Sequence, residues 1–564
     1  MPDPKPVPPD PIERLEQLRS HYGAAARSER DALIQRIEGS SIDEPEALVR
    51  YNDLLLFARA YPDDAAMLAR VERALGRISS RVRTLGDRAE EFRDTGLPGS
   101  YNVHTYSWSM LRELLATYPD ALELHWEEID DSSGYFELAS LCAAQSEVLG
   151  IDDDRLEGDT WMLAARSTQD RGDLAVLYRM LESSRLPEHA REILFDRLRL
   201  PIRWAIGSGE DARTTSIRRR KQIHFHREPL QREALDLAVE MKRPLPPVER
   251  LDLAEARSAI RWMKSAQSVR NRELYPLCHP EERDVVRVPL ERGLEIYCFG
   301  VRPPRRLLVE GLYGQFLVKN GVPIGYALSS VIGRVCEIGL NVYDTYRAGE
   351  NAFLYAQMMR TFHHLYGAEW FWVPRLQAGY GNDEGLQSGA FWFYDKLGFR
   401  SLDPKVRSAA DRERERRLRD PSYRAGISTL RRLVTEDLFW APAGVEEPGP
   451  YPLGALGLAV TRWISDRFGG DRERASVWAE REARKRLGLR VVSRSGQAEQ
   501  EAFHRLAPLV AMIPDWSTWP NEERNRLARL VRAKGSTRET SYLELSRQLP
   551  RWLRFLRSFA PNLD

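Results

Sequence analysis

Two residues of this chain combine a side chain that can transfer protons with a recognisable structural setting. Glu337 lies in a strand-like run, 335–342, and Tyr394 lies in an aromatic helical block, 387–399. Carboxylate and phenol groups can accept a proton from a reacting group or donate one to it. What these two residues do depends on the elements that hold them, and the surrounding sequence pattern predicts those elements.

The segment around them alternates strands and helices. Strands are predicted at 294–299, 314–318, 323–329, 335–342, 369–373 and 399–402, and helices at 352–366 and 386–397. The turn Asn320-Gly321 is the strongest short hairpin signal, and it joins the second strand to the third. Apolar residues with a period near 3.6 mark the first helix. The pattern predicts a sheet with helices packed against it.

The block 387–399 resembles the last helix and turn of the GNAT superfamily of acyl-CoA-dependent N-acyltransferases. The family form is N-x-x-A-x-x-F-Y-x-K-x-G-F, and only the first position differs here, where Gln387 replaces asparagine. Ala390 and Phe393 are three residues apart and share a helix face, so the small residue lets the helix approach the sheet. Gly398 is placed to end the helix in the left-handed conformation. The resemblance implies a GNAT-like fold.

The resemblance also implies a reaction, the transfer of an acyl group from acyl-CoA, most simply acetyl-CoA, to a small-molecule or protein amine. In that family the tyrosine matching Tyr394 often protonates the departing thiolate. An acid on the strand matching 335–342 takes the amine proton, directly or through water, and Glu337 is the candidate. The main chain of this strand would hold the thioester, at Gly339, Leu340, Asn341 and Val342. From the residues alone, Tyr394 could equally be a core tyrosine and Glu337 a solvated glutamate.

The family's phosphate loop, R/Q-x-x-G-x-G/A, matches this chain less well. The corresponding stretch contains Arg347, Ala348, Gly349, Glu350, Asn351 and Ala352, which together with Gln387 form the expected coenzyme-binding set. Glu350 stands where the middle glycine belongs, and Gly349 lies one residue early. Two like charges about 4 Å apart repel by ~4 kcal/mol at an effective dielectric of 20.

Two interpretations of this departure remain. Either Glu350 points away from the pyrophosphate while Gly349 takes the tight turn, or the domain does not bind coenzyme A in the usual way. A glutamate in a first helical turn is also ordinary helix-dipole chemistry. The alternative function is therefore a catalytically inactive GNAT-like domain that acts as a binding or scaffold module.

The predicted fold class is α+β, with a central GNAT-like mixed β-sheet domain flanked by N-terminal and C-terminal all-α regions. The tail has six prolines in its first eleven residues, a composition that does not form a helix. The predicted boundaries are a disordered proline-rich tail at 1–11, an all-α domain at 12–206, a basic and proline-rich connector at 207–247, the GNAT-like domain at 248–404 and a C-terminal helical region at 405–564.

Composition argues against several other classes of protein. Of the 564 residues, 42% are hydrophobic and 30% charged, and the formal net charge is +1, so no overall field recruits nucleic acid or an anionic membrane. No apolar run approaches the ~18 residues of a membrane-spanning helix, and the first residues show no signal-peptide pattern. Four separated cysteines without a C-x-x-C pair favour a reducing compartment. We expect a cytoplasmic protein without a membrane partner.

Other groups of residues give weaker indications of a functional site. The run 213–227 holds six Arg or Lys residues, no acid and one aromatic, Phe225, so nucleic-acid docking is possible in principle; a solvated linker or a clamp on acidic helices is favoured. His224 and His226 have no third ligand at metal-site spacing, so no metal is expected. The loop 377–385 is either an acceptor or coenzyme channel or simply a tight connection. No dinucleotide fingerprint, P-loop or serine-hydrolase elbow occurs in the sequence.

Overall fold

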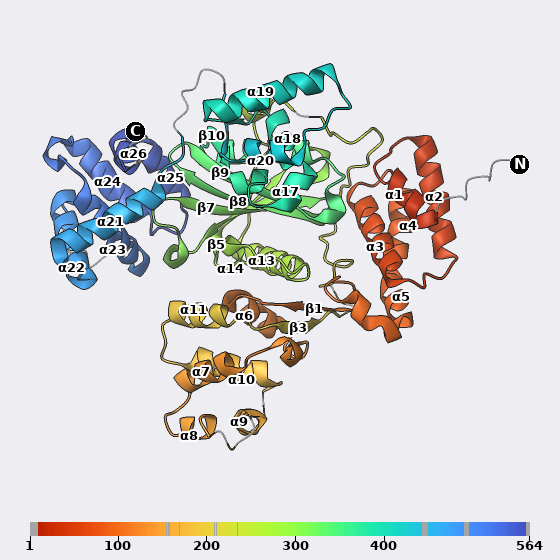
Figure 1. Ribbon diagram of the computed structural model, residues 1–564, viewed down its shortest axis with the longest axis horizontal. Coiled ribbons are helices and arrows are strands. Elements are labelled where there is room, and N and C mark those ends of the chain that lie inside the picture. The colour runs from red at the N-terminus through yellow and green to blue at the C-terminus, as the bar shows by residue number, and fades with distance from the viewer. Residues whose placement is uncertain are drawn as a thin grey trace, which may run out of the picture. The chain divides into compact units, whose positions relative to one another are not determined.

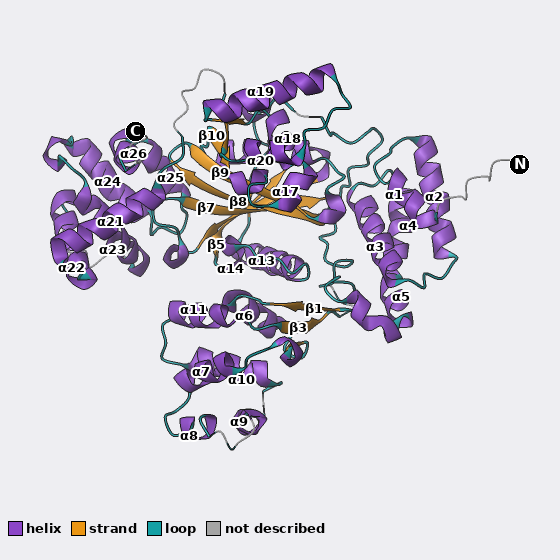
Figure 2. Ribbon diagram, in the orientation of Figure 1, coloured by secondary structure: helices purple, strands orange, loops and turns teal. Residues whose placement is uncertain are grey.

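The computed structural model describes residues 10–153, 155, 158–168, 170–207, 209, 211–233, 235–442, 449–489 and 496–559. The chain divides into two compact units. The first comprises Met1–Leu230, Arg257–Cys278 and Val318–Ile324, and the second comprises Gln231–Ala256, His279–Leu317 and Gly325–Asp564. Figures 1 and 2 show the helices and strands of both units.

The first unit is mainly helical. Its helices are α1 (Pro11–Leu18), α2 (Ala24–Glu38), α3 (Pro45–Ala60), α4 (Ala65–Gly76), α5 (Ile78–Thr84), α6 (Trp108–Thr117), α7 (Ser133–Cys142), α8 (Val148–Ile151), α9 (Gly158–Ala165), α10 (Asp173–Ser183), α11 (Glu188–Leu198), most of α13 (Leu253–Ser268) and α14 (Tyr275–Cys278). The predicted disordered tail is wrong at Pro11, which begins α1 after the N-cap Asp10. Proline is tolerated there because the first helical N–H has no partner in any case. Residues 1–9 lie outside the described residues.

The sequence pattern predicted an all-α domain at 12–206, but this region is not entirely α-helical. It also holds a three-stranded antiparallel sheet in which β3 (Ile202–Ala205) pairs with β1 (Tyr101–His104) on one side and β2 (Leu122–Leu124) on the other. Strands of three or four residues are too short for alternation to be distinguished from a helical pattern.

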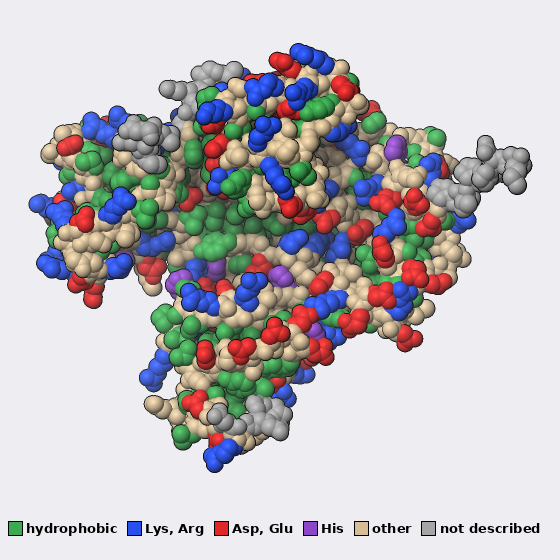
Figure 3. All heavy atoms as spheres, viewed as in Figure 1, with side chains coloured by type: hydrophobic (Ala, Val, Ile, Leu, Met, Phe, Trp, Pro, Cys, Tyr) green, Lys and Arg blue, Asp and Glu red, His purple; other side chains and the backbone are tan. Residues whose placement is uncertain are grey.

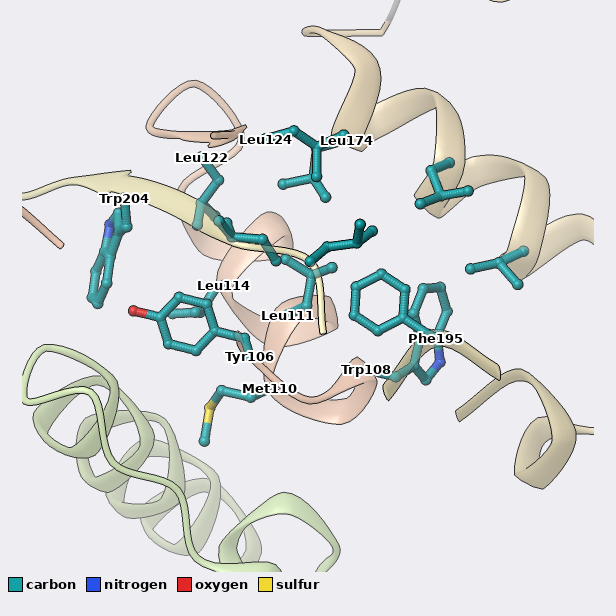
Figure 4. Close-up of a cluster of buried hydrophobic side chains, with 14 of the residues drawn as sticks. Tyr106, Trp108, Met110, Leu111, Leu114, Leu122, Leu124, Leu174, Phe195 and Trp204 are labelled. Atoms are coloured by element: carbon teal, nitrogen blue, oxygen red, sulfur yellow. The ribbon is translucent and has the colours of Figure 1, made fainter. Parts of the chain in front are cut away.

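This small sheet shares a hydrophobic core with the helices around it (Figure 4). Trp108 is 1% exposed and stacks on Tyr178 with ring centroids 5.0 Å apart. Trp204 of β3 lies in the same cluster of buried side chains. Long-range hydrogen bonds hold the unit together as well, because the buried amide of Asn102 donates to the carbonyl of Val269 at 2.9 Å.

The basic run 213–227 belongs to this first unit and contacts the chain itself. Arg213 forms an ion pair with Asp53 of α3 at 2.7 Å. The Arg218 guanidinium lies 5.1 Å from the ring centroid of Trp262. Two of its arginines therefore engage neighbouring helices, which agrees with the clamp interpretation. These contacts do not test the less favoured alternative, docking of nucleic acid by this run.

The second unit is built on a nine-stranded mixed sheet with the order β11-β12-β10-β9-β8-β7-β6-β5-β4. Its strands are β4 (Glu249–Arg250), β5 (Pro280–Pro289), β6 (Leu294–Val301), β7 (Gly311–Lys319), β8 (Val322–Ile332), β9 (Val335–Val342), β10 (Trp370–Val373), β11 (Arg400–Ser401) and β12 (Leu438–Trp440). β9 and β10 run parallel and are connected through α15 (Asn351–Tyr366). A parallel pair requires a crossover of this kind.

All the strands predicted between 294 and 402 are present in this sheet, with small shifts at their ends. The predicted helix 386–397 is instead two helices, α17 (Asp383–Ser388) and α18 (Ala390–Lys396), separated at Gly389. Gly389 has a φ of 72°, a left-handed conformation that interrupts a helix and favours glycine.

The sheet also takes a strand from beyond residue 404. β12 lies between β10 and β11 and is antiparallel to both. Two helices, α19 (Pro404–Arg419) and α20 (Ile427–Leu433), connect β11 to β12. The chain is thus an α+β protein, with a central mixed sheet and helical regions N-terminal and C-terminal to it.

The remaining helices of the second unit are α12 (Leu237–Lys242), α16 (Arg375–Ala378), α21 (Leu453–Phe468), α22 (Arg472–Leu487), α23 (Gln497–Met512), α24 (Asn521–Ala533), α25 (Thr540–Arg547) and α26 (Pro550–Arg557). A buried charged network fixes the C-terminal ones to the sheet. Arg306, 1% exposed, donates to the carbonyl of Lys534 at 2.7 Å. The Lys534 ammonium donates to the carbonyl of Glu310 at 2.6 Å and pairs with Glu539.

Asp284 on β5 gives this network a pH dependence. Burial, opposed by Arg306 and reinforced by Glu539, raises the pKa of Asp284 to about 6. The carboxyl group of Asp284 therefore holds its proton more tightly in the folded chain than in the unfolded chain. As a result, the free energy of unfolding falls as pH rises from about 4 to about 6. We expect Asp284→Asn to be more stable than the parent by about 2–3 kcal/mol near pH 7.5, and no more stable near pH 4. Urea denaturation at both pH values tests this, and equal stability near pH 7.5 would contradict it.

Candidate active site

A partly exposed strip lies on one face of the strands β8 and β9, in the largely buried centre of the sheet. The side chains along it pair across the two strands, Tyr326 with Asn341, Leu328 with Gly339 and Ser330 with Glu337. Residues directly opposite each other in an antiparallel pair point to the same face. The strip therefore brings three residues of the predicted site, Glu337, Gly339 and Asn341, to one partly exposed face.

Glu337 is the acid at one end of this strip. Burial raises its pKa from 4.5 to about 7, and like-charge repulsion from Glu310 and Asp437 adds to the effect. Among the described residues, no lysine or arginine forms an ion pair with Glu337. A carboxyl group with this pKa is about half ionised near pH 7, so it can take a proton from an amine and release it again.

The pairing of β9 with β10 stops immediately beyond Glu337, because β10 ends at Val373. Their parallel pairing ends where Glu337 meets Trp372, whereas β9 stays paired with β8 as far as Val342. The side chain of Gln377, from α16, lies against the freed part of β9. A Cβ atom on Gly339 would lie 2.4 Å from Gln377 Nε2, so the amide can approach the strand this closely only because residue 339 is glycine.

Tyr394 reaches the same place from α18. Its phenol donates to Gln377 Oε1 in a long hydrogen bond of 3.4 Å. Burial raises the pKa of Tyr394, so the phenol keeps its proton at neutral pH and remains a donor. The ring also packs edge-on against Tyr355 and Phe399, with centroids 5.7 and 5.8 Å away. Tyr394 is thus both a core residue and a neighbour of the strip.

The sequence pattern did not single out Gln377. The polar residue Asn382 of the same loop caps α17, accepting the N–H of Gly385 at 3.0 Å. One feature of the sequence could have identified Gln377, namely its position close after β10. Functional side chains commonly lie just beyond the carboxyl end of a parallel strand.

Glu350 turns into the protein. Its side chain is fully buried, and its carboxylate accepts the backbone N–H of Gln231 at 3.0 Å and the Arg292 Nε–H at 2.7 Å. The first of the two interpretations left by the sequence requires Glu350 to point away from the pyrophosphate, and a carboxylate buried against Arg292 meets that requirement. Gly349 does not take a left-handed turn, because its φ is not positive. Its N–H donates to the carbonyl of Tyr346 at 2.9 Å.

The rest of the 347–352 loop keeps some phosphate-binding features and lacks others. The backbone N–H groups of Ala348, Asn351 and Ala352 meet no acceptor in the described part of the chain. Free N–H groups at the start of a long helix such as α15 can bind phosphate. Arg347, in contrast, already pairs with Asp344 at 2.7 Å and with Glu384 at 2.9 Å.

The other expected coenzyme contacts are dispersed. Leu340 and Val342 belong to the opposite face of β9 by strand alternation. Gln387 is exposed on α17 and, in the described structure, forms no hydrogen bond with the 347–352 loop. Asn341 stays in the strip, where its amide donates to the Tyr326 hydroxyl at 3.2 Å.

Other kinds of site find little support in the part of the chain that the structure describes. No group of three or more His, Cys, Asp or Glu side chains there could hold a metal ion, and no described helix is long and apolar enough to cross a membrane. Comparison with protein-family models, with curated proteins and with solved structures gave no match. The function has to be argued from the site itself.

Proposed function

We propose that this chain is an N-acyltransferase, which transfers an acyl group, most simply acetyl, from acyl-CoA to an amine. The observation that carries the proposal is Glu337, a carboxylate with a pKa near 7 on the partly exposed strip, at the point where the pairing of β9 with β10 ends. The resemblance of the block 387–399 to GNAT enzymes supports the same reaction. Acyl-CoA would supply the acyl group in activated form, as a thioester.

The predicted site residues have distinct roles in this proposal. Glu337 takes the proton from the ammonium group of the acceptor, directly or through water, and so leaves a nucleophilic amine. Main-chain groups of β9 beside Gly339 hold the acyl carbonyl. Tyr394 donates its proton, or a hydrogen bond, to the sulfur as the carbon–sulfur bond breaks. The free N–H groups at Ala348, Asn351 and Ala352 would hold the pyrophosphate.

Gln377 adds a requirement to this mechanism. Its amide lies against Gly339, where the acyl carbonyl would be held, so Gln377 must either move aside or donate an Nε2–H to the carbonyl. In both cases the space beside residue 339 must remain open. The free thiols of all four cysteines fit a reducing compartment, and we propose the cytoplasm as the place of action.

Calorimetric titration of the protein with acetyl-CoA and with longer acyl-CoAs tests the proposal, and we expect at least one of them to bind. Gly339→Ala should weaken that binding, because the added Cβ pushes Gln377 into the open space. Gly457→Ala is a matched control, since a Cβ at this position in α21 meets no atom within 4 Å. If folded protein binds none of the acyl-CoAs, the proposal fails.

A second candidate is a catalytically inactive domain of the same architecture that serves as a binding or scaffold module. Two observations favour it. Gln377 occupies the space beside Gly339, and Arg347 is already paired with Asp344 and Glu384. Under this alternative, Glu384→Gln, which releases one partner of Arg347, binds acyl-CoA no better than the parent. Clear turnover by the parent would exclude it.

A further inference from the structure

A hollow of about 610 Å³ lies on the second unit, between the end of α21 and the first half of α22, and the proposed acyl transfer does not use it. It is lined by Arg467, Phe468, Asp471, Glu473, Arg474, Val477, Trp478 and Arg481. Figure 3 shows Lys and Arg side chains in blue beside apolar ones in green over the part of the molecule labelled α22 in Figure 1. The volume is that of an ordinary small-ligand site.

The three arginines of this hollow have no ion-pair partner among the described residues. Further along α22 the situation differs, because Arg484 pairs with Glu480 at 3.3 Å and Arg486 with Glu482 at 2.7 Å. Three guanidinium groups that face one space repel one another, and an anion placed between them would remove that repulsion.

Two carboxylates also line the hollow, and neither neutralises the arginines. Asp471 is the N-cap of α22, and its side chain accepts the backbone N–H of Arg474 at 2.9 Å. Glu473 is exposed in the first turn of the helix. With three arginines against two carboxylates, the lining keeps a positive excess.

The floor of the hollow is aromatic. Trp478 packs against Phe468 and Trp463, with ring centroids 5.8 and 5.9 Å away. The Arg467 guanidinium lies 4.7 Å from the Trp478 centroid. A guanidinium held over an indole is a flat surface, and its far side can stack a second planar ring, as arginine does with unstacked bases.

The spacing along α22 combines these features on one face. Arg474, Trp478 and Arg481 stand at positions i, i+4 and i+7, which share a helix face. The two arginines are two turns apart, about 10 Å along the axis, on either side of the aromatic residue. Cationic groups that alternate with a stacking surface match a ligand that carries both phosphate and a planar base.

We propose that this hollow binds a nucleotide, either free or within a single strand. Arg474 and Arg481 hold the phosphate oxygens through paired N–H donors, and the base stacks on the guanidinium of Arg467. An acidic peptide fits less well, because it offers carboxylates but no planar ring to continue the stack. The site is independent of the acyl transfer proposed above and stands or falls separately.

Fluorescence anisotropy of a labelled single-stranded oligonucleotide with the full-length protein tests this at low salt. The variant Arg467→Gln/Arg474→Gln/Arg481→Gln should bind at least tenfold more weakly. The slope of log affinity against log salt should fall by about 1.4, as expected when the two phosphate contacts of Arg474 and Arg481 on a single strand are lost. Lys405→Gln/Arg412→Gln/Arg432→Gln is the matched control, because it removes the same charge from exposed residues of α19 and α20. We expect the control to stay within about twofold of the parent.

Competition separates the two sources of the ligand. Displacement of the oligonucleotide by a free nucleoside triphosphate identifies a nucleotide site, and failure of displacement with retained oligonucleotide binding identifies a single-strand site. Three results would overturn the proposal: no binding of either ligand at low salt, equal weakening in both triple variants, or binding of polyglutamate as tight as that of the oligonucleotide.

Discussion

Glu337→Gln is expected to lower kcat for amine acylation by about 10²–10⁴-fold, the usual range for loss of a general base. The amide has nearly the same shape but cannot take a proton from the acceptor. Because no cation of the described chain pairs with Glu337, the substitution strands no buried charge, and the sheet should keep its stability. Acyl-CoA affinity should be nearly unchanged, since Glu337 acts on the amine. Steady-state kinetics together with calorimetry separate the two effects.

The pH profile distinguishes a base from a residue that only shapes the strip. With the pKa of Glu337 raised to about 7, kcat/KM of the parent should rise with pH through about 7, as the carboxylate forms. Glu337→Gln should lack this limb. Glu310→Gln removes one of the repelling charges, so the limb should move to lower pH while activity remains. A profile that is identical in the parent and Glu310→Gln would contradict the assignment of the limb to Glu337.

The sequence predicted the centre of this site because its signals are local. The Asn320-Gly321 turn and the alternation along β9 are enough to place Glu337, Gly339 and Asn341 on one face of a strand. In the same way, the period of α15 is visible in its own residues. These predictions needed no knowledge of what lies on the other side of the sheet.

The surroundings of Glu337 could not be predicted in this way. Glu310 directly precedes β7 and Asp437 directly precedes β12. Their charges help to raise the pKa of Glu337, and only the assembled sheet brings them near it. β12 has three residues and no pattern of its own, so nothing in the sequence marks it as part of this sheet. The amide of Gln377 likewise meets Gly339 only because β10 ends at Val373 and α16 follows directly beside β9.

Glu350 shows the same limit for a charge. The sequence identifies a carboxylate in a glycine's place, and the electrostatic cost follows if that carboxylate faces a phosphate. It does not identify the partner, Arg292, which lies 58 residues away in the chain. With that partner, the residue changes from an obstacle to coenzyme binding into a structural ion pair. A Glu350→Gly substitution is therefore a test of stability and not of coenzyme affinity.

Glu350→Gln is expected to lower the free energy of unfolding by about 3 kcal/mol, close to the usual cost of removing one partner of a buried ion pair. The side chain of Glu350 is 0% exposed and that of Arg292 is 26% exposed, so the guanidinium left behind is only partly hydrated. The substitution also weakens the acceptor for the Gln231 N–H, through which the segment before α12 is held to the start of α15. Urea denaturation of parent and variant at the same pH measures the loss.

Glu384→Gln is the matched control, because it removes the same charge from a neighbouring ion pair that faces solvent. The side chains of Glu384 and Arg347 are 74% and 49% exposed, and exposed pairs contribute only ~0–1 kcal/mol. Combining Glu350→Gln with Arg292→Met should recover part of the stability, since the second change removes the stranded charge. Equal losses in Glu350→Gln and Glu384→Gln would mean that the buried pair does not hold the loop. A loss in Glu350→Gln that Arg292→Met fails to relieve would instead place the stabilisation in the Gln231 contact.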